Sequence, residues 1–451
     1  MKIVYIVHCV DAEGPLYESI DATFQRLETL YNIKDIEPSR ENLQKIQNRE
    51  IDLGPVREKV ADNFSPHLLN YLSTWDQVDE MLKRVISKTF RDKMKDSFGG
   101  GWVYNWHCVD HIGYEYNPRK RDIGYLNIFD HYSTFLSKNN ASQDAIHFHF
   151  HPMPFNKDAS VNCTSYLNSP TLYEILCRRL IDRQWFPSVN RAGFHVERPD
   201  SHWFLEQWIP FDISNISAET SEMSRVGKDF QNGRMGDWRR APKDWSIYHP
   251  SHDDYQQPGH CRRYIARILN VLGRLASINE YEVRKAFSRA HSGLPTLMGV
   301  TGHDFRDLGA EVDYVRELIK KISPEFPEVK FKFSEVKEAF RRVLWSEQND
   351  FGSLELDISF VNDPEIPYME IKTVSGEVFG PQPFLAIKTK SKRYLHDNLD
   401  FSMDGKSWTY SFYNSTVLLD EVESVGIAAN DKYGNIFVKC LKMSDLNLVE
   451  R

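Results

Sequence analysis

Three histidines at every second position form a stretch whose residue types and spacing suit metal binding. Residues 146–152 read IHFHFHP, so His147, His149 and His151 alternate with phenylalanines and a proline ends the run. In a β-strand, side chains two residues apart point to the same side, so the three imidazoles would share one face. Imidazole is the commonest protein ligand of divalent transition metals. The stretch therefore indicates a metal site, although a single histidine on an apolar strand is more often a hydrogen-bonded core residue.

A pair of acids follows the first apolar run of the chain. KIVYIVHCV at residues 2–10 is typical of a buried strand, and Asp11 and Glu13 come directly after it, before Gly14 and Pro15. The two carboxylates would point the same way, and burying them together is costly unless they bind a cation or share a proton. The alternative is a solvated loop in which both acids are ordinary.

Two later stretches carry further candidate catalytic groups. Arg191 and His195 lie in NRAGFHVERPD, and Asp212 follows in FDIS. An arginine beside an acid cluster can hold a catalytic carboxylate and fix its protonation state. His303 ends the apolar run LPTLMGVTGH and precedes Asp304, an arrangement that suits a general acid with an orienting partner. Ordinary surface ion pairs are the alternative for the charged residues of the first stretch.

Strand-like and helical segments alternate over residues 1–347, with a charged helical insertion around residues 40–98. Such alternation is typical of an α/β protein with a mostly parallel sheet or barrel, whose functional residues gather at the carboxyl ends of the strands. Residues 352–451 change to short β-rich runs separated by Gly, Asn, Asp and Pro turns, which predicts a C-terminal all-β sandwich domain. We expect this second domain to serve as structural support or as an oligomer contact.

Composition and charge exclude several classes of protein. The 451 residues hold 56 Lys+Arg against 64 Asp+Glu, a net charge of −8, which argues against general nucleic-acid binding. No stretch approaches the roughly 20 apolar residues that span a bilayer. The start of the chain is too short and too soon interrupted by acids for a signal peptide. The six cysteines form no C-x-x-C pair, so we expect a cytoplasmic protein with reduced thiols.

Five stretches, taken in order, resemble the motifs of the polysaccharide deacetylase (NodB-homology) superfamily of carbohydrate esterases. Those motifs are an acid pair written T-F-D-D-G-P, then H-[ST]-x-x-H-P, R-x-P-[YF], an aspartate segment and a late strand-end histidine. The order matches and covers most of residues 1–347. The matching stretches are VDAEGP (10–15), HFHFHP (147–152), RAGF (191–194), FDIS (211–214) and VTGH (300–303).

The resemblance implies a distorted (β/α) barrel that holds one divalent metal, usually zinc, by an acid and two histidines. It places His147 and His151 on the two metal histidines and His149 on a variable position of the motif. We expect Asp11 to be the third ligand and Glu13 to be the catalytic base. The exchange of these two acid roles stays open, because the triplet Asp-Ala-Glu replaces the usual adjacent aspartates.

The same resemblance implies roles for two later residues and shows two departures from the family pattern. Arg191 falls on the arginine that orients the base, and His303 falls on the general acid. Phe148 stands where the family has Ser or Thr, and Gly193 stands where proline is usual. These departures bear on the esterase activity more than on the fold.

Together these features predict a metal-dependent hydrolase that removes an acyl group, most simply acetyl, from a sugar or glycan precursor. One alternative is a barrel with a decayed site that binds a glycan or a partner protein. Another is a hydrolase of a non-sugar C–N amide bond, because the barrel alone does not set the substrate. The sequence leaves the oligomeric state open, a homo-oligomer included. We expect the substrate to contact His149, Trp106, His195 and Asp212.

Overall fold

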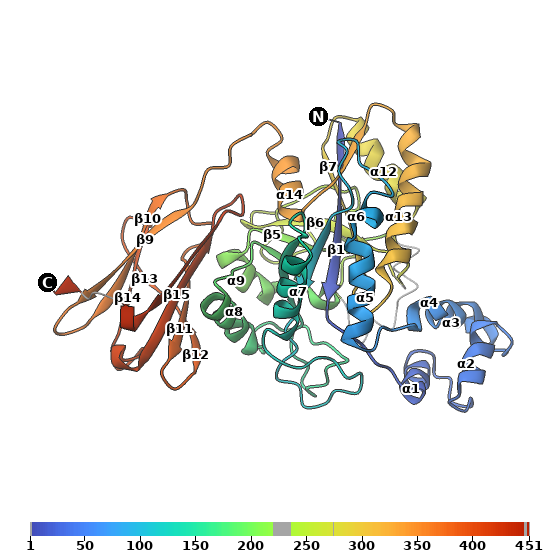
Figure 1. Ribbon diagram of the computed structural model, residues 1–451, viewed down its shortest axis with the longest axis horizontal. Coiled ribbons are helices and arrows are strands. Elements are labelled where there is room, and N and C mark those ends of the chain that lie inside the picture. Colours follow the sequence, from blue (N-terminus) through green and yellow to red (C-terminus); the bar gives the residue numbers. More distant parts are fainter. Residues whose placement is uncertain (1, 220–235, 274, 446–448, 451) are drawn as a thin grey trace.

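Seven parallel strands form a closed barrel in the computed structural model, which describes residues 2–219, 236–273, 275–445 and 449–450 (Figure 1). Strands β1 to β7 pair in chain order, and β7 pairs with β1 to close the ring. The predicted α/β barrel is thereby confirmed. The strands are β1 (Ile3–Ala12), β2 (Tyr104–Cys108), β3 (Ala145–Phe150), β4 (Val189–Ala192), β5 (Phe211–Asn215), β6 (Tyr264–Asn270) and β7 (Thr296–His303), and β8 (Lys330–Phe333) is added beside β1.

The first strand, β1, is buried along its whole length and has three neighbours. One of its edges pairs with β7 from Val4 to Asp11. The other edge is shared, because residues 3–6 pair with β8 and residues 8–12 pair with β2. An apolar, β-branched run suits a strand that is covered on both faces. This pairing fixes the point at which β1 ends and the two acids begin.

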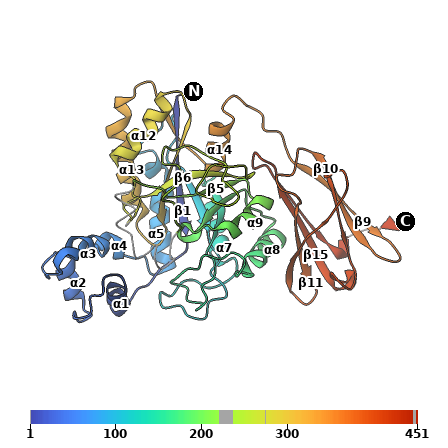
Figure 2. The same ribbon diagram turned by 180° about the vertical axis from the view of Figure 1, so that it is seen from behind.

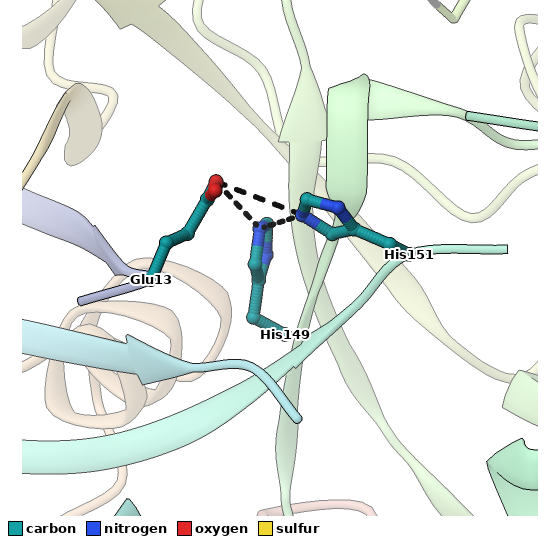
Figure 3. Close-up of side chains that lie close together, drawn as sticks. All are labelled: Glu13, His149 and His151. Carbon is teal, nitrogen blue, oxygen red and sulfur yellow. Dashed lines mark hydrogen bonds and ion pairs between the residues drawn. The ribbon is translucent and has the colours of Figure 1, made fainter. Parts of the chain in front are cut away.

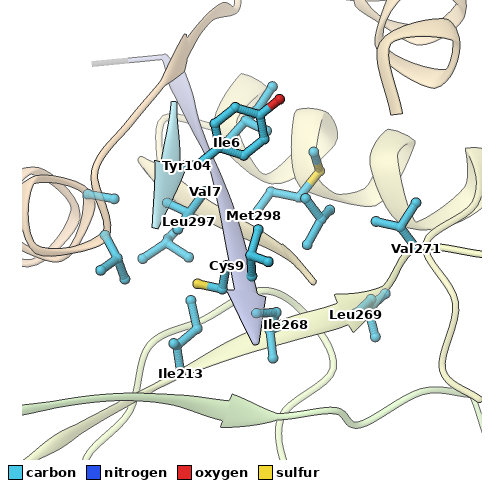
Figure 4. Close-up of a cluster of buried hydrophobic side chains, with 14 of the residues drawn as sticks. Ile6, Val7, Cys9, Tyr104, Ile213, Ile268, Leu269, Val271, Leu297 and Met298 are labelled. Atoms are coloured by element: carbon cyan, nitrogen blue, oxygen red, sulfur yellow. The ribbon is translucent and has the colours of Figure 1, made fainter. Parts of the chain in front are cut away.

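Amphipathic helices cover the outer surface of the barrel. In α5 (Trp75–Ile86), Val78, Met81, Leu82 and Val85 recur three or four residues apart and are buried. They belong to the large hydrophobic cluster around β1, part of which Figure 4 shows. The other helices of this layer are α6 (Lys88–Arg91), α7 (Asn127–Lys138), α8 (Thr171–Arg183), α9 (Pro199–Trp208), α12 (Glu280–His291), α13 (Leu308–Ile322) and α14 (Val336–Leu344), with the short 3-10 helices η2 (Gly193–His195) and η4 (Ser323–Glu325).

Between β1 and β2, residues 20–69 form a group of small helices that we call the helical arm. It lies on one side of the barrel, and Figure 2 shows it on the opposite side from the C-terminal strands. The helical segment begins at Ile20 rather than near residue 40, and it packs around a small hydrophobic cluster of its own. Its helices are α1 (Ile20–Tyr31), α2 (Arg40–Gln47), η1 (Gly54–Val56), α3 (Arg57–Asn63) and α4 (Pro66–Leu69).

The C-terminal region forms two mainly antiparallel sheets whose facing side chains share one hydrophobic cluster. The first sheet has the strand order β13-β14-β10-β9-β17, and the second has the order β12-β11-β15-β16. The strands are β9 (Glu355–Asn362), β10 (Tyr368–Ser375), β11 (Phe384–Thr389), β12 (Tyr394–Asp397), β13 (Asp400–Phe401), β14 (Ser407–Ser411), β15 (Val422–Asn430), β16 (Ile436–Lys442) and β17 (Val449–Glu450), with η5 (Leu419–Glu421) and η6 (Met443–Asp445).

The second of these sheets packs directly on the helix α8 of the barrel layer. A hydrophobic cluster joins residues of α8 to residues of β11 and β15. Gly426 allows this close approach, because a Cβ at this position would lie 2.8 Å from Leu180 Cγ. Asn430 Nδ2 donates hydrogen bonds of 2.7 Å to the carbonyl oxygens of Pro187 and Trp208. The two sheets are therefore fixed to the barrel by both apolar and polar contacts.

Hydropathy gives no candidate for a membrane span among the helices of the described residues.

A fully buried ion pair ties the end of β2 to two helices. Arg179 on α8 donates to Asp110 Oδ2 through Nη2 at 2.6 Å and through Nε at 3.0 Å. The same guanidinium donates to the carbonyl oxygen of Cys108 at 2.7 Å. Asp110 Oδ1 accepts from the backbone N–H of Leu126, next to the start of α7. Breaking this pair would leave an uncompensated charge in the interior.

Asp110→Ala is expected to lower the free energy of unfolding by about 3–5 kcal/mol, because Arg179 would stay buried without a counter-charge. Asp130→Ala is the matched control, since it removes the partner of Arg183 from an exposed ion pair between α7 and α8. That change should cost less than about 1 kcal/mol. Urea unfolding followed by circular dichroism measures both. Equal losses would contradict the role given to burial.

Candidate functional site

Carboxylate, guanidinium and imidazole side chains meet where the parallel strands of the barrel end. Four strands contribute, and all of the contributed side chains except one imidazole are buried. In an α/β barrel, this end of the strands carries the functional residues. From or just after each strand, these are Asp11 and Glu13 (β1), His149 and His151 (β3), Arg191 (β4) and His303 (β7).

Glu13, His149 and His151 form a compact triangle of ligand atoms (Figure 3). The two Nε2 atoms lie 3.0 Å apart, and Glu13 Oε1 lies 3.8 Å from His149 Nε2 and 3.6 Å from His151 Nε2. A single point about 2.0 Å from all three atoms satisfies these separations, and zinc bonds to histidine nitrogen and carboxylate oxygen are about 2.0–2.2 Å long. The triangle therefore fits a divalent cation held by one carboxylate and two imidazoles.

A backbone contact sets the orientation of His149. Its Nδ1 lies 2.8 Å from the carbonyl oxygen of Arg191, on the neighbouring strand β4. A carbonyl oxygen only accepts, so Nδ1 carries the proton and Nε2 presents its lone pair to the triangle. Metal-binding histidines commonly donate their second N–H in this way, which fixes the ring and its tautomer. For His151, burial lowers the pKa and favours the uncharged form that a ligand requires.

Glu13 is held at both its side chain and its backbone. Arg121 Nη1 donates to Glu13 Oε2, which leaves Oε1 for the triangle. The backbone N–H groups of Glu13 and Gly14 donate to Asp304 Oδ1 at 3.0 Å and Oδ2 at 2.9 Å, and the Tyr132 hydroxyl donates to Oδ2 at 2.8 Å. Burial alone would raise the pKa of Glu13, but the charge of Arg121 and contacts with the two imidazoles bring it well below the ordinary value. The carboxylate is therefore ionised at neutral pH.

Asp11 is engaged by the arginine of β4 instead. Arg191 donates to Asp11 Oδ1 through Nε and to Oδ2 through Nη2 at 2.9 Å, a two-point contact in which both groups are buried. Burial would raise the pKa of Asp11, but the guanidinium beside it outweighs this effect and the pKa falls below its usual range. This arrangement holds a carboxylate in one orientation and keeps it charged. Arg191 thus contacts Asp11, whereas the acid expected from the sequence as the base was Glu13.

His303 completes the group from β7, the strand that pairs with β1 and on which His303 is the register partner of Asp11. Its Nε2 lies 3.6 Å from Asp11 Oδ2 and 3.8 Å from Glu13 Oε1. Burial lowers the pKa of His303 to about 4, although the two carboxylates oppose the shift. The imidazole is therefore uncharged at neutral pH. Asp304, expected as its partner, instead contacts the backbone of the β1 loop.

The structure places His147 away from this triangle. Its Nε2 lies 3.3 Å from Glu335 Oε1 and 3.3 Å from Asn105 Oδ1, and its ring packs 5.0 Å from that of His107. Because β3 stays extended to Phe150, residues four apart on it are separated by about 13 Å, whereas residues two apart are within about 7 Å.

The expected set of Asp11, His147 and His151 is therefore not brought together. His149 and Glu13 occupy the places next to His151.

Two residues expected to contact substrate lie elsewhere. Trp106 is buried on the outer face of β2, where its Nε1 donates to Asp144 Oδ2 at 3.1 Å and its ring stacks on Tyr104. Asp212 is buried as well and accepts from Asn190 Nδ2 at 2.6 Å. Neither side chain lines the pocket beside the triangle.

His195 does line that pocket, together with Phe194. Its ring nitrogens lie 3.4–3.5 Å from the guanidinium of Arg191. Phe194 and His195 have φ angles of 50° and 55°, a left-handed conformation that is unfavourable for side chains of this size. Gly193 precedes them because a Cβ there would lie 2.2 Å from His151 Cδ2, so the glycine admits the imidazole. This contact explains why Gly193 stands where the deacetylase motif usually has proline.

The pocket has a volume of about 210 Å³ and opens on Asp11, Glu13 and His303. The helical arm, the loop after β6 and the segment after β7 form its walls. Four arginines line these walls, and none of them lies in a motif; Arg121, for example, belongs to a basic loop. The lining of the pocket also includes Leu16, Arg26, Leu30, Leu68, Tyr71, Arg119, Arg121, Asn270, Phe305 and Arg306.

A second group of ligand-type atoms, His202, Glu206 and Cys261, lies outside the barrel ends. Arg263 Nη2 lies 3.0 Å from His202 Nδ1, and Glu206 accepts from backbone N–H groups. Burial raises the pKa of the Cys261 thiol to about 11. A guanidinium beside His202 and Glu206 and a protonated thiol make this group a poor cation site.

No family model matches this chain, and no match is found among the curated proteins or the solved structures. The assignment of the site therefore depends on its own geometry.

His149→Asn and His151→Asn are each expected to weaken zinc binding by more than about 100-fold, beyond the 10–100-fold typical of losing an outer hydrogen-bond partner of a ligand. His147→Asn, the matched control on the same strand, should leave the affinity within about threefold. Competition with a fluorescent zinc chelator measures all three. Loss of binding in His147→Asn with retention in His149→Asn would contradict the assigned ligand set.

Proposed function

We propose that this protein is a metal-dependent hydrolase that removes an acyl group, most simply acetyl, from nitrogen or oxygen of a sugar or glycan precursor. The observation that carries the proposal is the triangle of Glu13, His149 and His151 beside the ion pair of Asp11 and Arg191. One face offers ligands for a cation, and the adjacent carboxylate is oriented and ionised. The motif order that resembles polysaccharide deacetylases supports the same assignment.

The geometry favours an exchange of the two acid roles expected from the sequence. Glu13 shares its triangle with the two imidazoles, whereas Asp11 makes a two-point contact with Arg191. We therefore assign Glu13 as the metal ligand and Asp11 as the base. When bound, a divalent cation such as zinc supplies Lewis-acid polarisation of the acyl carbonyl and lowers the pKa of a water molecule.

The residues around the candidate metal site then move one proton through the reaction. Asp11 accepts a proton from the attacking water, and Arg191 keeps its carboxylate in line. His303 Nε2 lies 3.6 Å from Asp11 Oδ2, beyond direct hydrogen-bond distance, so the proton passes to the imidazole through one bridging water molecule. From there it is delivered to the departing amine or alcohol as the acyl bond breaks. The same sequence of steps would serve a non-sugar amide.

The complete set of groups weighs against a barrel with a decayed site. A binding protein has no need of an ionised carboxylate held by a two-point arginine contact, nor of an uncharged histidine beside it. A buried ion pair can be structural, as Asp110 and Arg179 show, but the Asp11 carboxylate also lies 3.6 Å from the His303 imidazole and lines the pocket.

Asp11→Asn is expected to lower kcat for acetate release by about 10²–10⁴-fold, because the base is lost while the ligands remain. The assay uses zinc-loaded protein and a panel of N- and O-acetylated monosaccharides and nucleotide sugars. His147→Asn should retain activity, and zinc content is measured for each variant. Release of no acyl group from the whole panel by zinc-loaded protein would overturn the proposal.

The pH dependence of kcat/KM tests the role of His303. Its lowered pKa of about 4 keeps the imidazole uncharged and able to take a proton down to that pH. We expect kcat/KM to stay level below pH 6.5, where an ordinary histidine titrates, and to fall only near pH 4. Zinc content is followed over the same range, because protons also compete for His149 and His151. A fall centred near pH 6.5 at constant zinc content that disappears in His303→Gln would contradict this role, whereas a fall that persists in this variant reports the water molecule.

A further inference from the structure

The pocket that opens on the candidate site carries more positive than negative charge. Its lining includes four arginines but only two carboxylates, Asp11 and Glu13. Both of these acids already have a guanidinium partner. The four arginines come from three separate segments: Arg26 from the helical arm, Arg119 and Arg121 from the loop after β2, and Arg306 from the segment after β7.

Two of these arginines share one carboxylate. Arg26 Nη2 lies 2.8 Å from Glu18 Oε2, and Arg119 Nη2 lies 3.2 Å from Glu18 Oε1. Glu18 is almost completely buried, so this group of three carries one net positive charge away from bulk water. Arg26 is itself buried, and its Nε has no hydrogen-bond partner among the described residues.

Arg306 has no carboxylate within ion-pair distance in the described ranges of the chain. Its Nε is buried without a hydrogen-bond partner there, and its guanidinium lies 5.1 Å from the centre of the Phe305 ring. The neighbouring Asp307 pairs instead with Arg84. Arg306 therefore presents a guanidinium to the pocket wall with an aromatic ring as its neighbour.

Guanidinium groups that are partly removed from water and short of counter-charges are costly. Several such guanidinium groups around one cavity repel one another, and an anion that enters the cavity lowers this cost. The planar guanidinium matches carboxylate and phosphate oxygens through paired N–H donors. The aromatic and aliphatic lining, including Tyr71, Phe305 and Leu68, adds an apolar wall of the kind that small-molecule pockets use.

We propose that the pocket binds an anionic substituent, a carboxylate or a phosphate ester, of the acylated substrate. The identity of the ligand as substrate rests on the proposed hydrolase function. The pocket volume of about 210 Å³ lies below the roughly 300–1,000 Å³ of pockets for drug-sized ligands, so it suits a small anionic sugar or an anionic end group. Because Asp11, Glu13 and His303 line the same pocket, an anion anchored by the arginines places the rest of the molecule at the site.

Binding of simple anions to the full-length protein tests this inference. Zinc and other divalent cations are first removed with a chelator, so that a metal cannot bind the anion itself. Inorganic phosphate and glucuronate are the anionic probes, and glucose is the neutral probe, each titrated at millimolar concentrations by calorimetry. Phosphate and glucuronate, or one of them, should bind, and glucose should not. Tighter binding of phosphate would indicate that the anionic substituent of the substrate is a phosphate ester, and tighter binding of glucuronate would indicate a carboxylate.

Arg306→Gln should weaken binding of the preferred anion at least tenfold, because it removes a guanidinium that has no ion-pair partner among the described residues. Arg57→Gln is the matched control, since Arg57 is an exposed arginine of the helical arm that lies outside the pocket. That variant should bind as the unaltered protein does. The inference is overturned if glucose binds as well as the anions, if no anion binds, or if Arg306→Gln binds the anion normally.

This result is separable from the test of the hydrolase. Anion binding by a protein that neither holds zinc nor releases acetate would retain the anionic pocket and remove the proposed function. Zinc-dependent acetate release that is equally fast on neutral and anionic acetylated sugars, with no anion binding, would retain the hydrolase and remove this inference.

Discussion

The arrangement of this site follows from one constraint: β1 delivers two carboxylates into the buried end of a barrel. Each must be balanced by a positive group, because an unpaired buried carboxylate would take up a proton or destabilise the fold. Asp11 obtains Arg191 from β4, and Glu13 obtains Arg121 from the loop after β2. Arg191 donates to both oxygens of Asp11, whereas Arg121 donates to only one oxygen of Glu13. This difference is the basis for the separate roles that we propose for the two acids.

The same constraint links the acids to the imidazoles. Arg191 donates to Asp11 with its side chain and accepts from His149 Nδ1 with its backbone, so one residue orients both the carboxylate and a ligand. Asp304 accepts hydrogen bonds from the backbone N–H groups of Glu13 and Gly14, which fixes the turn that carries Glu13. Burial raises the pKa of Asp304 to about 7, although these N–H groups oppose the shift. The positions of Asp11, Glu13 and His149 are thus maintained by Arg191 and Asp304, which do not line the pocket.

The sequence was sufficient for the parts of the structure that depend on local pattern. The apolar run of β1, the alternation over the barrel and the acids at the strand end follow from periodicity. Periodicity could not show which of the three histidines converge, because strand alternation places all three on one face. Which pair converges depends on where β3 stops, and that is decided by its pairing with β4 up to Ala192. Trp106 was misjudged for a related reason, since its neighbour His107 faces the barrel interior and Trp106 the helices. Arg121 carries no local signal, because its partner lies more than a hundred positions earlier in the chain.

The two additions to the barrel make different contacts with it. The helical arm places Arg26, Leu30 and Leu68 on the pocket wall, so it would affect which ligand fits the pocket that we propose to bind an anion. None of the described residues of the C-terminal sheets lines that pocket, and these sheets instead bury the outer face of α8. Since α8 carries Arg179, which is bonded to Asp110 at the end of β2, the sheets stabilise the strand ends from outside. Changes in the arm should therefore alter which ligand is selected, whereas changes in the sheets should act through the stability of the barrel.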